Sequence, residues 1–319
     1  MKRWQFMYFV FTLAGFCSLQ ASAAGEEDGQ WYPSRYGAAD TIGAANNLSP
    51  EKTLLATRLV KQGKAVSLAI DTGADTPAPP FRSYQMHIMH PGDGTGAPGG
   101  PLQATSNDDM MITWLGIGTQ IDGLGHAGIN HRYYNGVHAR DFVRPSGLAK
   151  FGTHEIPPIV TRGVLLDMAA FLGHDIVPAG TAYGRRDIEG AAERQGLRIE
   201  QGDVVLLHGA WMKNYQEGAG AWLWHGWPGL NVEGAQYLAR LGVVAVGADN
   251  AGLEAWDGTG GAPGSGVHQE LLARNGVYII EGVWTLDLAA AGVSEFLFVL
   301  GQPRFVGAAQ MVVNPIAIY

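Results

Sequence analysis

The chain has 319 residues, a formal net charge of −8 and 46% hydrophobic residues. This length and composition exclude a disordered chain and allow one large domain or two small ones. The acidic balance, with Lys and Arg not gathered in a long run, argues against a nucleic-acid-binding protein.

The first 23 residues are typical of an export signal. Lys2 and Arg3 give a positive start, residues 4–19 are mostly apolar, and Ala21-Ser22-Ala23 offers the small residues that a signal peptidase needs. A membrane anchor is the alternative, but the apolar segment is short and interrupted. We therefore expect cleavage near Ala23 and a periplasmic or secreted protein that leaves the membrane. The only cysteine lies inside this segment, so no disulfide is expected after cleavage.

The next part of the chain is predicted to form an N-terminal arm over residues 24–75. Ser49 is expected to cap a helix over 50–60 that begins with a proline, and 65–70 is predicted to be a strand. From 76 to 107 the chain is dense in Pro and Gly. A long irregular segment in a compact domain is usually a lid, a binding loop or a subunit contact.

The second half of the chain alternates short apolar strands with helices. Strands are predicted at 163–168, 204–207, 243–246, 277–280 and 296–300, and helices at 187–195, 231–241 and 267–274. Apolar runs of this length, bounded by Gly and Asp, are typical of strands buried on both faces of a mixed sheet under helices. We therefore predict an α/β fold with one domain over 76–319, to which the arm belongs.

One tract in the middle of the chain combines a carboxylate with an imidazole. Gln120 and Asp122 are two residues apart, a spacing that points both side chains to one side of a strand or extended turn. His126 follows after Gly123 and Gly125, which allow the chain to fold back toward Asp122. Such a pair can hold a metal ion or move a proton. The alternative is a turn aspartate beside a surface histidine.

The pattern of this tract resembles the hallmark His-x-Gly-Thr-His-x-Asp-x-Pro-x-His. Its matching residues are Gly118, Thr119, Asp122 and His126, and its departures are Gly116, Gln120 and Leu124. The hallmark belongs to the cyclase superfamily of metal-dependent hydrolases, which contains bacterial kynurenine formamidases, isatin hydrolase and trans-dienelactone hydrolase. Segments 131–136, 162–167, 202–207 and 267–272 are similar to further blocks of that family, so the resemblance runs from about 82 to 319. The Gly-Thr-Gln-x-Asp form resembles a longer-chain branch of the family.

The resemblance implies a fold and a metal site. The family fold is a swivelling β/β/α domain, with a mixed sheet at its core and flanking helices. In the family, the first two histidines of the hallmark and its aspartate bind one divalent ion, and the aspartate joins a later His and Glu at a second position. Here the first metal position is weakened at two residues. Gly116 has no side chain, and Gln120 could offer the metal only a neutral amide oxygen, which is a weak ligand for zinc. Asp122, His268 and Glu281 keep the second, so one zinc or manganese ion is expected, with two as the alternative.

The implied reaction is hydrolysis of a cyclic amide, a formamide or a lactone by a metal-bound hydroxide. His126 would move the proton, and Gln120 would orient the water or the substrate. Two alternatives remain open. One is a lactone hydrolase, or a metal-independent lyase or dehydratase, on the same fold; the other is a catalytically silent periplasmic protein that binds a small molecule. Family members usually assemble, so a homodimer or homotetramer is expected.

Four further side chains are predicted to contact the small-molecule substrate. His208 follows the strand at 204–207, His87 lies in the Pro- and Gly-rich segment, and Trp114 lies in the tract that leads into the motif. Trp211 begins an aromatic cluster that also contains Tyr215, Trp222, Trp224 and Trp227. Such a cluster forms either part of the core or the wall of a pocket for a planar ring.

Two other motifs are interpreted as structural. The glycine-rich run at 92–96 lacks the spacing, the strand and the Lys-Ser/Thr ending of a phosphate loop, so no nucleotide cofactor is expected. Asp249 and Asn250, with Glu254 close behind, follow a predicted strand; the resemblance implies that the family keeps acidic residues near this point, but the cap of a helix is the favoured interpretation.

Overall fold

The computed structural model describes residues 30–89, 98–217, 222–223, 225–259 and 266–319. The predicted signal peptide, residues 1–23, lies outside the described residues. Trp31–Tyr319 clusters as one unit, and strand β1 (Ala65–Ser67) joins the predicted arm to the main sheet by pairing with β15 (Ile316–Ile318). Among the helices of the described part, none is long and apolar enough to cross a membrane.

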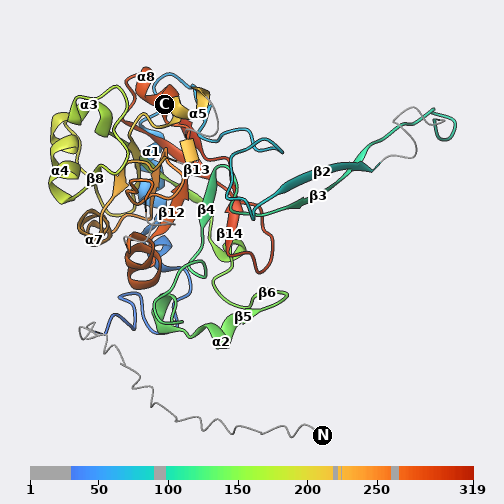
Figure 1. Ribbon diagram of the computed structural model, residues 1–319, viewed down its shortest axis with the longest axis horizontal. Helices are drawn as coiled ribbons and strands as arrows, with labels where there is room; N and C mark the ends of the chain where they lie inside the picture. The colour runs from blue at the N-terminus through green and yellow to red at the C-terminus, as the bar shows by residue number, and fades with distance from the viewer. Residues whose placement is uncertain (1–29, 90–97, 218–221, 224, 260–265) are drawn as a thin grey trace, which may run out of the picture. The chain divides into compact units, whose positions relative to one another are not determined.

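A nine-stranded mixed sheet runs through the described part of this unit (Figure 1). In spatial order its strands are β1, β15, β13 (Glu295–Leu300), β7 (Ile159–Asp167), β9 (Val204–His208), β11 (Ala245–Ala248), β12 (Tyr278–Glu281), β4 (Gln120–Asp122) and β14 (Gln310–Val312). The central strands β7, β9, β11 and β12 run parallel. The strands on both sides of them pair antiparallel.

Burial explains why the central strands have short, continuous apolar sequences. Every residue of β9, β11 and β12 is buried. A strand that is covered on both faces needs apolar side chains at successive positions rather than at alternate ones. The predicted α/β fold, with a mixed sheet and flanking helices, is confirmed.

Helices and short helical turns flank the sheet. The α-helices of the described chain are α1 (Pro50–Thr57), α2 (Ala139–Phe142), α3 (Met168–Leu172), α4 (Arg185–Arg194), α5 (Met212–Glu217), α7 (Val232–Leu241) and α8 (Leu286–Ala290). The 3-10 turns are η1 (Gly43–Asn47), η2 (Tyr134–Gly136) and η3 (Thr153–Glu155), and η4 (Gln269–Arg274) is a π-helical segment. Because α4 contacts both α3 and α7, and η4 contacts α7 and β12, these elements form a continuous layer.

Two helices begin and end at residues that the sequence singles out. The Ser49 side chain accepts a hydrogen bond from the Lys52 N–H at 3.1 Å, at the start of α1. The Asn231 side chain accepts one from the Gly234 N–H at 2.9 Å, at the start of α7. Gly242, with φ of 79°, ends α7 in the left-handed conformation that favours glycine.

The segment 76–107 is not irregular throughout, which corrects the prediction. Within it, β2 (Tyr84–Met89) pairs antiparallel with β3 (Asp108–Thr113), and this ribbon projects from the main sheet (Figure 1). Both strands are largely exposed, so they lack the alternation of apolar and polar residues that reveals a half-buried strand. Two shorter strand pairs were also not predicted: β5 (Val143–Arg144) with β6 (Gly147–Leu148), and β8 (Ala182–Tyr183) with β10 (Gly229–Leu230).

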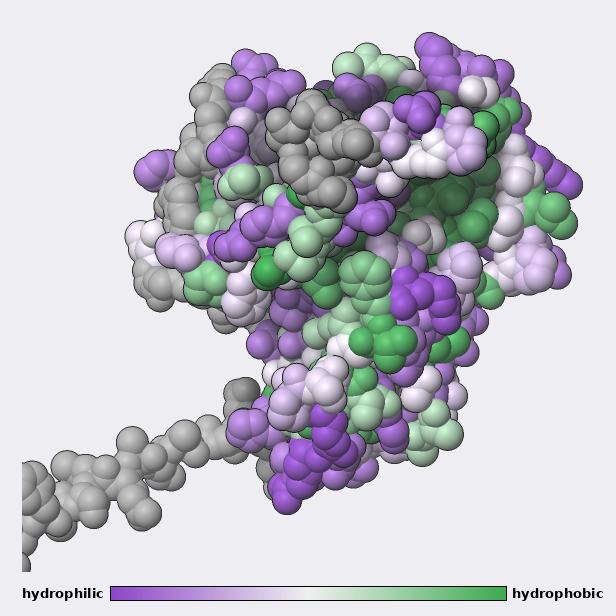
Figure 2. All heavy atoms as spheres, turned by 90° about the vertical axis from the view of Figure 1, so that its right-hand side faces the viewer, coloured by the Kyte–Doolittle hydropathy of each residue, from purple (hydrophilic) through white to green (hydrophobic). Residues whose placement is uncertain are grey.

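The carboxyl ends of the parallel strands bring polar side chains to one edge of the sheet. β9 ends at His208, Asp249 follows β11, and β12 ends at Glu281. Ligands of open α/β sheets bind outside this edge. The face drawn in Figure 2 is hollowed, and apolar side chains line the hollow.

Candidate metal and substrate site

The pairing of β4 with β12 builds the centre of the site. Its antiparallel register places Gln120 opposite Glu281 and Asp122 opposite Ile279. The Gln120 Nε2 donates to Glu281 Oε2 at 2.7 Å and lies 3.5 Å from Asp122 Oδ1. The side chains at 120 and 122 therefore share one side of the strand, as their spacing predicts. The amide nitrogen of Gln120 faces the carboxylates in this structure, so the residue orients Glu281.

Asp122 is fully buried and presents one uncommitted oxygen. Its Oδ1 accepts a hydrogen bond from Gln310 Nε2 at 2.8 Å, whereas its buried Oδ2 accepts none from any described residue. Burial by itself raises the pKa of Asp122. The charge of His126 and the contact with His268 outweigh that effect, and the pKa lies below its usual value. The carboxylate is therefore ionised with a free lone pair, which is the state that a metal ligand requires.

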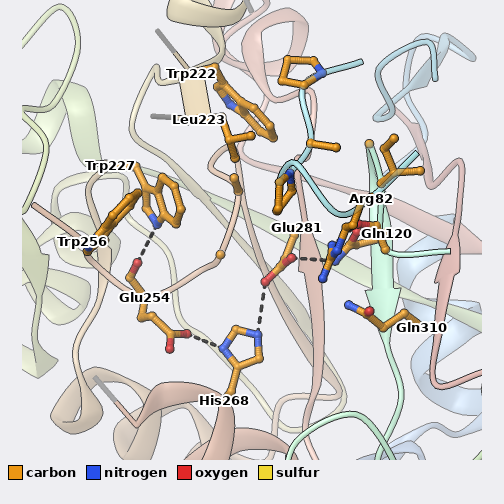
Figure 3. Close-up of a pocket in the computed structure, with 18 of the residues that line it drawn as sticks. Arg82, Gln120, Trp222, Leu223, Trp227, Glu254, Trp256, His268, Glu281 and Gln310 are labelled. Carbon is orange, nitrogen blue, oxygen red and sulfur yellow. Dashed lines mark hydrogen bonds and ion pairs between the residues drawn. The ribbon is translucent and has the colours of Figure 1, made fainter. Parts of the chain in front are cut away.

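His268, just before η4, lies among three carboxylates. Its Nε2 is 3.2 Å from Glu281 Oε1 and 3.4 Å from Asp122 Oδ2, and its Nδ1 is hydrogen-bonded to Glu254 (Figure 3). Burial disfavours the charged imidazole, but the carboxylate partners outweigh burial and raise the pKa of His268 well above its usual value. In this structure, the protonated ring of His268 therefore supplies the positive charge that offsets the three carboxylates.

Glu281 and His126 complete the cluster with pKa shifts of opposite sign. Burial and the neighbouring Asp122 raise the pKa of Glu281 to about 7, while His268 opposes them. Burial lowers the pKa of His126; Asp122 opposes this, and the positive charges of His268 and Arg82 add to it. Its Nε2 lies 3.8 Å from Asp122 Oδ2. A neutral imidazole at this place can accept a proton near neutral pH.

The residues present fit a divalent cation. The ligand atoms of Asp122, His126 and His268 all lie within 4.8 Å of one another. Glu281 Oε1 adds a further oxygen beside His268, and the unpartnered Asp122 Oδ2 faces the same place. Carboxylate oxygen and imidazole nitrogen are ligands that zinc and manganese both accept. Asp122, His268 and Glu281, which are far apart in sequence, are thus brought together in the fold.

A cavity of about 690 Å³ opens above this cluster. Its lining includes His126, Glu281 and His268, together with three indoles from Trp222, Trp227 and Trp256. Figure 3 shows the indoles on one side of the cavity and Arg82, Gln120 and Gln310 on the other. The cavity therefore has an aromatic wall, a charged floor and a polar wall.

Arg82 and Gln310 take up the space that a side chain at position 116 would need. A Cβ at Gly116 would lie 2.5 Å from Gln310 Oε1 and 2.8 Å from Arg82 Nη1. Arg82 Nη1 also donates a hydrogen bond to the Gly116 carbonyl. The sequence analysis missed both residues. Only the missing side chain at 116 signals that another group has to fill this place.

The four residues predicted to contact the substrate are not among the residues that line this cavity. His208 is buried behind the site, where its Nδ1 bonds Thr285 Oγ1 at 2.7 Å. Trp211 is buried too, and its indole donates to the Trp222 carbonyl, so it supports the aromatic wall from behind. His87 pairs with Met110 in the projecting ribbon.

Trp114, the fourth of these residues, is half exposed and lines a separate, smaller cavity of about 350 Å³ that shares Gly116 and Gln310. Its ring meets that of Phe81 edge to face at 5.7 Å. Phe81 itself lines the larger cavity. Trp114 therefore supports the entrance of the larger cavity without being part of its lining.

The interpretation of Asp249 to Glu254 as the cap of a helix is wrong, because the described residues 249–259 contain none. Asp249 accepts the N–H groups of Gly209 and Trp211, and so fixes the turn after β9. Glu254 belongs to the site, where it holds the outer nitrogen of His268. Trp224 of the predicted aromatic cluster lies outside the described residues.

Comparisons with known proteins agree with this fold. The crystal structure of a novel cyclase superposes with a TM-score of 0.79 at 29% identity, covering 89% of this chain and 98% of that one. Isatin hydrolase A from Labrenzia aggregata, bound to benzyl benzoate, gives a TM-score of 0.60 at 18% identity, covering 84% and 98%. An isatin hydrolase bound to the product analogue thioisatinate gives 0.59 at 17%, covering 85% and 99%.

No curated protein matches the chain. The two isatin hydrolases share the fold with it at low identity, whereas the novel cyclase is also similar in sequence. The sequence model of the cyclase family matches residues 55–255, which contain Asp122, His126 and Glu254. The chain therefore belongs to the cyclase family.

Proposed function

We propose that the protein is a metal-dependent hydrolase in which Asp122, His268 and Glu281 hold one divalent ion. The observation that carries the proposal is the buried, ionised Asp122, whose Oδ2 accepts no hydrogen bond from any described residue and lies 3.4 Å from His268 Nε2 and 3.8 Å from His126 Nε2. Burying a charged oxygen without a partner is costly unless a cation or a donor meets it. Structures described as potential metal-dependent hydrolases share the fold, which supports the same conclusion.

The residues around this position have separate tasks. A bound divalent ion acidifies water and polarises a carbonyl group, which is the chemistry of metal-assisted hydrolysis. His126 Nε2 lines the cavity as a neutral base, so it can take a proton from water and return it to the leaving nitrogen or oxygen. Gln120 positions the Glu281 carboxylate through its 2.7 Å hydrogen bond. Glu254 fixes the ring of His268 from its outer nitrogen.

The proposed substrate is a cyclic amide, a formamide or a lactone with a planar, apolar part. Three indoles line one side of a cavity of about 690 Å³, a size that suits a small molecule. Offset or edge-to-face contacts with such walls favour planar rings. One structure of this fold is named as an isatin hydrolase and is bound to the product analogue thioisatinate, which supports a small aromatic substrate.

Metal analysis joined to an activity panel tests this function. The purified protein is analysed by inductively coupled plasma mass spectrometry, stripped with a chelator and reloaded with zinc or manganese. Isatin, an aryl formamide and an aromatic lactone then serve as substrates. We expect about one ion per chain and turnover of at least one substrate that is lost on stripping and restored on reloading. Turnover that persists in fully stripped protein sinks the proposal and favours the metal-independent lyase; tight ligand binding with no turnover favours a silent binding protein.

Export and self-association remain proposals of the same kind. The signal-like start predicts a periplasmic or secreted protein, and the family resemblance predicts a homodimer or homotetramer. Cell fractionation of tagged protein tests the first, and light scattering after size exclusion tests the second. A protein that stays in the cytoplasm with its first residues uncleaved, or a monomer at micromolar concentration, contradicts them.

A further inference from the structure

We infer that Arg82 is a substrate-binding residue that pairs with a carboxylate, so that the proposed hydrolase acts on acidic aromatic substrates. This inference deepens the proposed function by naming a substrate class, and for the reaction itself it rests on that function. Its basis is that the Arg82 guanidinium has no acidic partner among the described residues, together with its place in the cavity lining and the shape of that cavity.

The guanidinium of Arg82 has no anionic partner in the described part of the chain. Its one polar contact there is the bond from Nη1 to the Gly116 carbonyl, and its buried Nε donates to no described residue. The Phe81 ring lies 5.8 Å from the guanidinium carbon, a contact that leaves the planar donor fork free. An arginine has five N–H donors, and a buried one without an acceptor is costly. A ligand that brings acceptor oxygens removes that cost.

The acidic residues of the site do not supply those acceptors. The Glu281 oxygens meet His268 and Gln120, and Asp122 Oδ1 meets Gln310. The remaining Asp122 oxygen faces His268 and His126. These carboxylates are thus turned to the cation position and to neutral amides. The charge of Arg82 stays directed at the cavity that it helps to line.

The place of Arg82 follows from the glycine at 116. Arg82 Nη1 and Gln310 Oε1 both lie within 3 Å of where a Cβ would stand at that residue, at 2.8 and 2.5 Å. A fixed positive charge of the chain therefore lines the same cavity as Gln120, His268 and Glu281. A bound ion and the Arg82 guanidinium, as two positive centres in one cavity, can bind different groups of one substrate. An ion held by Asp122, His268 and Glu281 would polarise the scissile carbonyl, and the guanidinium holds a separate carboxylate of the same substrate in a bidentate pair.

The opposite wall limits the rest of the substrate. Trp222, Trp227 and Trp256 line the side away from Arg82 (Figure 3), so a planar ring between the indoles and the guanidinium spans the cavity. Arg82 therefore favours a ligand with a negatively charged group at one end, and the indoles favour a planar ring in the rest of the ligand. An aromatic ring that carries a carboxylate beside its amide, formamide or lactone group satisfies both walls.

Calorimetric titration with two small probes tests the pairing without any turnover. Benzoate and benzamide have nearly the same shape, but only benzoate is charged. Each is titrated into the wild type, Arg82→Gln, Arg82→Lys and the surface control Arg58→Gln, with the ion loaded and after chelation. Chelated protein is needed because a carboxylate also binds a metal ion directly. Circular dichroism and melting temperature confirm that each variant is folded.

We expect benzoate to bind the chelated wild type at least about tenfold more tightly than benzamide, as a charged hydrogen-bonded pair implies. Arg82→Gln should abolish that preference, Arg82→Lys should restore part of it, and Arg58→Gln should keep it. Equal affinity of the wild type and Arg82→Gln for benzoate overturns the inference, and so does an equal loss of both probes. Metal content, measured on the same samples, reports separately on the proposed function, because a protein that fails to bind an ion can still show the benzoate preference.

Discussion

The two ends of the tract from 116 to 126 meet the cavity in different ways. Around Asp122, charged groups converge on one buried oxygen that has no hydrogen-bond partner among the described residues. Around Gly116, the backbone recedes and the side chains of Arg82 and Gln310 fill the space. The Asp122 end offers carboxylate oxygens to a cation, whereas the Gly116 end already has the positive charge of Arg82.

The two ends of this tract therefore differ in the sign of the charge that nearby side chains bring to the cavity. Carboxylates converge near Asp122, and their negative charge favours a bound cation. Near Gly116, Arg82 supplies a positive charge that neither chelation nor pH removes, because arginine stays protonated. If the comparison holds, changes to Asp122 or to the residue that fixes His268 should lower metal content, and changes at Arg82 or Gly116 should alter ligand preference and leave metal content unchanged.

The largest effect is expected from Asp122→Asn. The amide has the shape of the carboxylate, but it removes the charge that faces His268 and His126. Loss of a residue that holds a ligand in place costs about 10- to 100-fold in metal affinity, so loss of a ligand itself should exceed that range. Metal titration with a competing chelator measures it, with the exposed Asp71→Asn as control. An unchanged affinity would remove Asp122 from the ion site.

Next in size is His126→Ala. Removing a general acid–base group should lower kcat by about two to four orders of magnitude. The metal content should stay near that of the wild type, since Asp122, His268 and Glu281 remain. The exposed His174→Ala is the matched control. A variant that keeps full turnover shows that His126 moves no proton, and one that loses its ion shows that His126 is a ligand.

A smaller effect should follow from Glu254→Gln. Glu254 is buried and bonded to the outer nitrogen of His268, so it fixes the ring without touching the ion position. The loss of metal affinity should be about 10- to 100-fold, with the benzoate preference of the chelated protein intact. Glu51→Gln, on an exposed helix start, serves as the control. Unaltered metal affinity would contradict a supporting role for Glu254.

The sequence predicted the chemistry of the first end better than that of the second, for a physical reason. Asp122, His268 and Glu281 lie at strand ends or helix starts that short apolar runs and glycines mark, so their meeting could be expected from the family resemblance. Arg82 and Gln310 precede β2 and begin β14, and neither of these strands was predicted. Their role exists only because the fold brings two distant side chains into the space left at Gly116, and no local pattern reports such a contact.

The same limit explains why the residues predicted to contact the substrate do not line the larger cavity. His208 ends a strand at the correct edge of the sheet, but its ring turns to Thr285 and Asp249, which satisfy it in the core. Trp211 and Trp222 are near neighbours in sequence, yet only Trp222 reaches the cavity. Strand ends indicate the edge on which a site lies. Which side chain reaches the cavity depends on the packing behind it.

The pH dependence of the melting temperature should differ between the chelated protein and the protein loaded with the ion. In the chelated protein the pKa of His268 is raised well above its usual value. Its contribution to the free energy of unfolding is therefore complete below about pH 6.5 and lost as the pH rises through the folded-state value. The melting temperature of chelated protein should still fall above about pH 8, where Glu281, with a pKa of about 7, has largely titrated. His268→Gln should lack this slope.

Loading the ion should reverse that trend, because metal binding requires a neutral imidazole and competes with the proton. The melting temperature of loaded protein should rise relative to the chelated form as the pH increases from about 7. Scanning calorimetry of both forms over this interval measures the gap. A gap that stays constant with pH would mean that the ion does not displace the proton of His268, and would place the ion elsewhere.

The smallest effect is expected from Gly116→Ala, which tests the second end directly. The new Cβ would meet only the flexible ends of Gln310 and Arg82, so the cost in free energy of unfolding should be about 1 kcal/mol, at the low end for overpacking. Gly73→Ala is a matched control, because a Cβ there meets nothing within 4 Å. Arg82 must shift to make room, so the benzoate preference should weaken while the metal content stays unchanged. Equal stability and equal preference in the two alanine variants would show that the guanidinium does not depend on the space at Gly116.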